Sequence, residues 1–265
     1  MIKKTFLFLS SLALWSCAPN PPEIKSPDSI SFRIETIKRE MALDSLLRMH
    51  FLVEDLRIDS AYASSESLET EIRTNLLANN ISTEGSYADY GDMINKMIDE
   101  YLTLNDEDEL DQTWELSQSV KVVLNEQGLF GLQSSHYSYT GGAHGNTLIG
   151  NQTYRLDNQT LLSLDSLLIP AQKQQFIAFC ESKFRQQQEL NKGESLDTHG
   201  FWFNDNTFYL PENFSYSTRG LSLFYNSYEI APYAYGIIEI TLSSAEIKPY
   251  LKGEYLLLQN ESASL

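Results

Sequence analysis

The sequence predicts an α+β fold: antiparallel sheets with a few packed helices, in two closely associated parts. Two observations favour this class. Strand-like segments with apolar residues at alternate positions recur along the chain, and several are separated only by short turns. A smaller number of segments show helical periodicity. With 265 residues and 42% hydrophobic composition, the chain can bury a core in one large domain or two small ones.

The predicted strands are 30–37, 46–58, 114–124, 130–139, 147–156, 208–210, 221–225 and 237–242. The segments 114–124, 130–139 and 147–156 should form a meander of three antiparallel strands. The first of these should place its apolar side chains on one face: Trp114, Leu116, Val120, Val122 and Leu124.

Helices are predicted after Ser64, after Ser86, over about 171–190 and from Ser243. The first has the apolar stripe Leu68, Ile72, Leu76 and Leu77, and the second has Tyr90, Ile94, Met97, Ile98 and Tyr101. Ser86 is the candidate N-cap of the second helix. The acidic run 105–111 is expected to be a solvated loop, because it lacks the glycine and glutamate spacing of a calcium loop.

The N-terminus predicts a lipoprotein signal peptide over residues 1–16. Lys3 and Lys4 precede an apolar run that is too short to span a bilayer. Leu14-Trp15-Ser16-Cys17 resembles the bacterial lipobox, which implies diacylation of Cys17. An ordinary signal peptide cut nearby is the alternative. Residues 17–29 are Pro- and Ser-rich and are expected to tether the domain to the membrane. No acidic run follows the cysteine, which favours a periplasm-facing anchor.

Charge and cysteine content narrow the function classes. The net charge of −17 excludes nucleic acid as a partner, because phosphate binding needs a basic surface. Cleavage before Cys17 removes two lysines and no acid, which gives −19. If Cys17 carries lipid, Cys180 has no disulfide partner, and its spacing from Phe176 and Phe184 predicts a buried, unreactive thiol.

The first candidate binding segment is Ser138-Tyr139-Thr140-Gly141-Gly142-Ala143-His144-Gly145. Gly-Gly favours a tight hairpin. A two-residue turn would place Tyr139 opposite His144 and Ser138 opposite Gly145. Tyr137, Tyr139 and His144 would then share one face, and His136 would lie on the other. Such a patch could bind a sugar or peptide; the alternative is a purely structural hairpin.

The second candidate segment is Tyr228-Glu229-Ile230-Ala231-Pro232-Tyr233-Ala234-Tyr235-Gly236. Exposed tyrosines here could stack on sugars and donate hydrogen bonds. The alternative is a buried turn in which Pro232 sets the bend and the tyrosines pack in the core.

Together, the hairpin motif and Gly220-Leu221 followed by the 228–236 motif resemble one envelope family. It is the extracellular region of RsiV-type anti-sigma factors, shared with the non-catalytic N-terminal region of PdaC-type peptidoglycan deacetylases. The resemblance covers 30–255 and implies a PdaC-like α+β part over 30–156 and an RsiV-like α+β part over 157–255, with a tail over 256–265. The site candidates that it implies are Tyr137, Tyr139, Thr140, Gly141, Gly142, His144, Tyr228 and Tyr233.

In the anti-sigma factors this region binds lysozyme, and in the deacetylases it accompanies a catalytic domain. This chain has no deacetylase domain, no cytoplasmic sigma-binding segment and no transmembrane span after the signal. We therefore expect a non-enzymatic, lipid-anchored envelope module that binds cell-wall glycan or a lysozyme-like protein.

Two alternatives remain open: a polysaccharide or peptidoglycan hydrolase that uses His144 as acid and base, and a structural envelope scaffold. No HExxH, GxSxG or P-loop is present. We expect no cofactor, and the histidines His50, His136, His144 and His199 suggest no zinc site.

Overall fold

The computed structural model describes residues 27–43, 46–78, 86–108 and 112–257. The predicted signal peptide, Cys17 and most of the tether lie outside these residues. The predicted α+β class is confirmed: the chain forms a five-stranded sheet and a three-stranded sheet with packed helices. Among the described helices, none has both the length and the apolar character needed to cross a membrane.

The five-stranded sheet has the order β1-β2-β3-β4-β5. Its strands are β1 (Phe32–Leu43), β2 (Leu46–Ile58), β3 (Trp114–Glu126), β4 (Leu129–Tyr139) and β5 (Asn146–Arg155). The meander predicted for β3, β4 and β5 is confirmed, since each pairs antiparallel with the next. β2 and β3, however, pair in parallel, which requires a long crossover connection.

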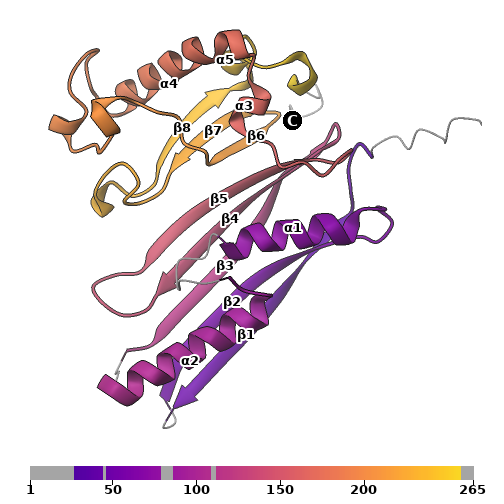
Figure 1. The fold of residues 1–265 in the computed structure, drawn as a ribbon, viewed down its shortest axis with the longest axis vertical. Helices are drawn as coiled ribbons and strands as arrows, with labels where there is room; N and C mark the ends of the chain where they lie inside the picture. The colour runs from indigo at the N-terminus through magenta and orange to yellow at the C-terminus, as the bar shows by residue number, and fades with distance from the viewer. Residues whose placement is uncertain (1–26, 44–45, 79–85, 109–111, 258–265) are drawn as a thin grey trace, which may run out of the picture.

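That crossover contains α1 (Ser65–Ala78) and α2 (Tyr90–Asp108), which cover one face of the sheet (Figure 1). The predicted stripe of α1 is buried in full. Two details of α2 were predicted wrongly. The carboxylate of Asp89, not Ser86, caps the helix, because it accepts the N–H of Asp92 at 2.8 Å. The helix also continues to Asp108, so the first part of the acidic run is helical rather than a loop.

The apolar residues of β3 do not all lie on one face, contrary to the prediction, because the strand contains a bulge. The register shifts between Val122 and Leu124. Trp114, Leu116 and Val120 therefore pack under the helices, whereas Leu124 packs in the core of the C-terminal part.

The three-stranded sheet has the order β6-β7-β8, all antiparallel. Its strands are β6 (Phe214–Ser217), β7 (Gly220–Tyr225) and β8 (Ile238–Ser243). The helices of this part are α3 (Leu164–Leu167), α4 (Lys173–Gln187) and α5 (Ser244–Ile247). Short 3-10 turns are η1 (Pro170–Gln172), η2 (Asp197–His199), η3 (Asn204–Asn206), η4 (Tyr233–Tyr235) and η5 (Gly253–Tyr255). In Figure 1, α4 lies on the side of this sheet away from the five-stranded sheet.

The core of the C-terminal part forms around α4. Phe176, Cys180 and Phe184 are fully buried on its inner face, as predicted, and burial raises the pKa of the Cys180 thiol to about 12. The strand predicted over 208–210 is wrong. Phe208 instead packs irregularly against Phe184, and the backbone carbonyl of Tyr209 accepts the hydroxyl of Tyr225. Residues 208–210 therefore contribute to the core without forming a strand, and β6 begins at Phe214.

Candidate functional site

The tip of the β4–β5 hairpin is wider than the sequence predicted. Ser138 pairs with Asn146 rather than with Gly145, so the connection spans residues 140–145. Gly141 and Gly142 do take positive φ, 101° and 88°. Hydrogen bonds hold the wider loop: the hydroxyl of Tyr139 donates to the carbonyl of Gly142 at 3.1 Å, and the N–H of Gly142 donates to the side chain of Gln112 at 3.2 Å.

In the observed register, His144 lies outside the strands. It lies exposed in the loop rather than opposite Tyr139. The prediction that His136 lies on the opposite face of the strand from Tyr137 and Tyr139 is correct, because His136 is buried on the helix-covered face. The ring of Tyr137 packs so closely over Gly145 that a Cβ there would overlap it.

The two candidate motifs meet in space. The imidazole of His144 stacks on the ring of Tyr233, with centroids 3.8 Å apart and planes 14° from parallel. Tyr228 continues the row, 5.6 Å from Tyr233. The hydroxyl of Tyr233 donates to the carbonyl of Gly145 at 2.9 Å, across a sequence separation of 88 residues. We call His144, Tyr233 and Tyr228 the ring stack.

The hydrogen bond of His144 fixes its tautomer. Nδ1 lies 3.0 Å from the carbonyl oxygen of Gly145, which can only accept. Nδ1 therefore carries the proton in the neutral ring, and Nε2 presents a lone pair. The ring stack thus combines aromatic faces with a hydrogen-bond acceptor.

Exposure decides between the two interpretations of the 228–236 segment. Tyr228 is 51% exposed and Tyr235 is 46% exposed, so the segment is not a buried turn. Tyr228 also has a φ of 68°, which is unusual for a bulky residue. The Glu229 carboxylate accepts the N–H of Asn226 at 2.9 Å, and partial dehydration by the surrounding protein raises its pKa. Backbone strain and large exposed rings together are typical of binding loops.

Asparagine side chains join the two parts at the edge strand β5. The amide of Asn226 accepts the N–H of Ile149 at 2.8 Å and donates to its carbonyl at 3.0 Å. Asn213 donates to the same carbonyl at 2.7 Å and accepts from Asn151 at 2.8 Å. Asn226 thereby bonds as the backbone of a neighbouring strand would, which satisfies an otherwise open edge. Neither asparagine was predicted as a contact residue from the sequence, since asparagine beside a turn is common for conformational reasons.

A hollow of about 380 Å³ adjoins the ring stack, lined by Thr147, Ser227, Tyr233, Ala234, Tyr235, Gly236 and Ile237. Thr140, Gly141 and Gly142 form the hairpin tip and are not among the residues that line this hollow. Within the described ranges, no group of three or more His, Cys, Asp or Glu side chains is arranged to hold a metal ion.

Comparison with known families agrees with the architecture. Residues 165–245 match the family model described as "Protein of unknown function (DUF3298)", and residues 57–147 match the model "Deacetylase PdaC". These matches confirm the family resemblance, with the PdaC match in the N-terminal part of the chain and the DUF3298 match in the C-terminal part. His144 lies in the PdaC match, and Tyr228 and Tyr233 lie in the DUF3298 match. The PdaC match fits an extracellular or envelope protein. No curated protein matches the chain.

Two crystal structures of DUF3298 family proteins share this fold. The protein from Pseudomonas aeruginosa PAO1 is 16% identical, with a TM-score of 0.64 over 86% of this chain and 97% of its own. The protein from Bacteroides fragilis NCTC 9343 is 17% identical, with a TM-score of 0.65 over 87% of this chain and 96% of its own. At such identities the likeness concerns the fold alone.

Proposed function

We propose that this protein is a lipid-anchored, non-enzymatic module of the cell envelope that binds cell-wall glycan at the ring stack. The observation that carries the proposal is the meeting of His144, Tyr233 and Tyr228 in one partly exposed row. Aromatic faces bind the apolar faces of sugar rings, and Nε2 of His144 can accept a sugar hydroxyl. The anchor would be the lipid on Cys17, and the module would face the periplasm.

The contacts of His144 favour binding over hydrolysis. A hydrolase needs two or more titratable groups that converge near its acid or base. In the described part of the chain, His144 stacks on the ring of Tyr233 and bonds to the carbonyl of Gly145, and the hydroxyl of Tyr233 already donates its proton to that same carbonyl at 2.9 Å.

A basic, lysozyme-like protein is the second candidate ligand. The net charge of −17 would attract a basic partner, and the family resemblance includes lysozyme binding. Salt weakens binding that depends on charge attraction alone, and it weakens binding through a specific, partly buried interface much less.

Calorimetric titration tests both ligands. The full-length protein is titrated in a polyoxyethylene detergent, which carries no sugar, with soluble peptidoglycan fragments and separately with lysozyme. Both titrations are repeated at moderate salt and with Tyr233→Ala. Saturable, salt-resistant binding that the substitution weakens at least tenfold supports the proposal. Absence of binding to both ligands, or binding that salt abolishes, would refute it and leave the scaffold and hydrolase alternatives.

A further inference from the structure

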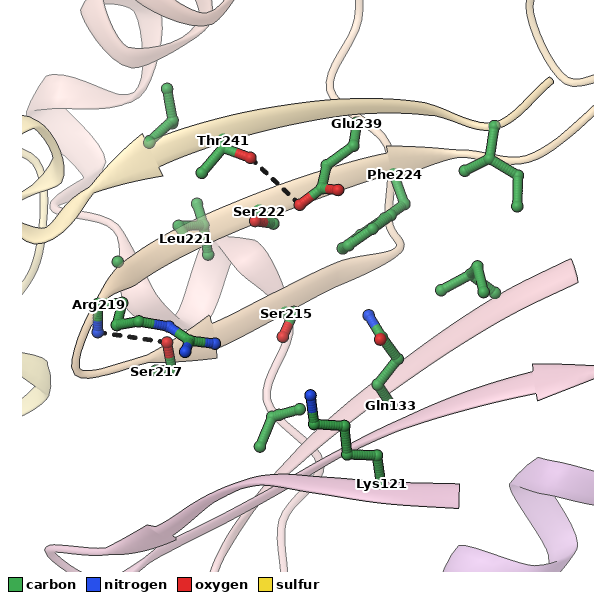
Figure 2. A pocket seen from close by; sticks show the side chains of 15 residues that line it. Lys121, Gln133, Ser215, Ser217, Arg219, Leu221, Ser222, Phe224, Glu239 and Thr241 are labelled. Atoms are coloured by element: carbon green, nitrogen blue, oxygen red, sulfur yellow. Dashed lines mark hydrogen bonds between the residues drawn. The ribbon is translucent and has the colours of Figure 1, made fainter. Parts of the chain in front are cut away.

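A second hollow, of about 530 Å³, lies between the two sheets. One wall comes from β3, β4 and β5, and the other comes from β6, β7 and β8. Figure 2 shows Lys121 and Gln133 extending from the five-stranded sheet toward Ser215, with Arg219 beside Ser217 at the opposite wall. This volume is within the range of small-ligand sites and suits a ligand of about disaccharide size.

The chemistry of this hollow is that of a polar ligand site. The groups that can bond to sugar hydroxyls are Gln133, Ser215, Ser217, Ser222, Thr241 and Glu239. Phe224 contributes an apolar ring to the same wall, and it is 6% exposed. The hydroxyl of Thr241 donates to the carboxylate of Glu239 at 3.2 Å, which orients this acid at the rim.

Two cations distinguish the hollow from the rest of an acidic molecule. Lys121 and Arg219 reach it from opposite walls, and both residues are exposed. Neither forms an ion pair with another described residue, whereas most basic side chains in the N-terminal sheet do, such as Arg33, Lys38 and Arg57. Lys121 and Arg219 outnumber Glu239, the one acidic residue of this lining, so the hollow carries net positive charge in a chain of net charge −17, which favours an anionic ligand.

The hollow is adjacent to the ring stack. Ile237 lines both this hollow and the smaller one that Tyr233 lines. A linear ligand that passes Ile237 would contact both hollows.

We propose that the hollow between the sheets is a second subsite that binds a carboxylate-bearing sugar, with Lys121 and Arg219 contacting the carboxylate and the hydroxyl-rich walls contacting the ring. This inference rests on the proposed glycan function and adds specificity to it: the rings bind sugar faces in general, and the cations select an acidic residue of the glycan.

A matched pair of disaccharides tests this subsite. N-acetylglucosaminyl-N-acetylmuramic acid carries a lactyl carboxylate that N,N′-diacetylchitobiose lacks. Both are titrated by calorimetry into the full-length protein in polyoxyethylene detergent. The variants are Lys121→Gln, Arg219→Gln and Tyr233→Ala. Lys192→Gln is the control, because it makes the same charge change at an exposed position that lines neither hollow.

The proposal predicts that wild type prefers the acidic disaccharide by about tenfold or more, because charge-assisted hydrogen bonds are stronger than neutral ones. Lys121→Gln and Arg219→Gln should each reduce this preference without changing affinity for chitobiose, and Lys192→Gln should leave it intact. Tyr233→Ala should weaken both ligands.

If wild type binds the two sugars equally, and Lys121→Gln and Arg219→Gln have no effect, the proposed subsite is overturned and the ring-stack function is unaffected. Failure of both sugars to bind would overturn the two proposals together. Displacement of the acidic disaccharide by an acidic tripeptide at similar concentration would overturn the assignment to sugar.

Discussion

Acidification should destabilise the fold through one buried histidine. His136 lies between β3 and β5 under the helices and is 2% exposed. The hydroxyl of Ser134 donates to the carbonyl of Gly150, so it accepts from Nε2–H of His136, at 3.1 Å. Nδ1 is then the unprotonated nitrogen, and it has no hydrogen-bond partner among the described residues. A proton on Nδ1 would be buried without an acceptor.

Burial accordingly lowers the pKa of His136 from 6.5 to about 4. A histidine with a lowered folded-state pKa stabilises the fold fully above its unfolded pKa, and this contribution is lost as the pH falls from about 6.5 to about 4. From these two values, the free energy of unfolding should fall by about 2 kcal/mol between pH 7.5 and pH 5, and by about 3 kcal/mol at pH 4.

The assay compares wild type with His136→Gln, which keeps a polar side chain but cannot titrate. Urea unfolding is followed by circular dichroism at each pH, and the measured quantity is the difference between the two proteins. The other titratable groups are the same in both proteins, so their contributions largely cancel in this difference. The variant should be less stable at pH 7.5, because glutamine packs less well than the imidazole in this buried position. As the pH falls, wild type should lose its higher free energy of unfolding relative to the variant. A difference that stays constant from pH 7.5 to pH 4 would show that His136 titrates alike in the folded and unfolded protein.

Three further predictions concern the backbone and the site. Gly220→Ala should destabilise the protein by about 2–4 kcal/mol in urea unfolding, because its Cβ would overlap the carbonyl of Leu242 at a φ of 137°, whereas Gly142→Ala, which meets open space, should cost about 1 kcal/mol; equal losses would contradict this. Asn226→Ala should lower the free energy of unfolding by about 1–3 kcal/mol and speed amide exchange at the β5 edge. Unchanged exchange there would contradict the role of Asn226 in pairing with that edge. Tyr228→Asn should relax the positive φ and stabilise the fold by up to about 1 kcal/mol while weakening glycan binding; a variant that is less stable and binds normally would contradict both parts.

Local periodicity predicted the elements that bury one face. The stripe of α1, the meander β3–β5 and the buried Cys180 on α4 all follow from spacing alone. The sequence could not predict the parallel pairing of β2 with β3, because a crossover is chosen by the packing of helices on the sheet and leaves no local pattern. The bulge before Leu124 is equally invisible, since one extra residue reverses the side-chain alternation without changing the composition.

The candidate site was predicted in part. Both motifs were selected from their glycines and aromatic residues, and the structure brings His144 and Tyr233 into contact. The register of the hairpin was wrong, because hydrogen bonds from Tyr139 and to Gln112 stabilise a longer loop than Gly-Gly alone indicates. The hollow between the sheets could not be predicted, since Lys121 belongs to β3 and Arg219 to the β6–β7 turn, and only tertiary packing brings both to one lining.

The most direct test of glycan binding at the ring stack is a titration followed by NMR. The protein is labelled with ¹³C-histidine, and soluble peptidoglycan fragments are added while the ring signals are recorded. Glycan binding at the ring stack should shift the His144 signal saturably and leave the signal of buried His136 unchanged. Binding that saturates by calorimetry while the His144 signal stays in place would contradict the account.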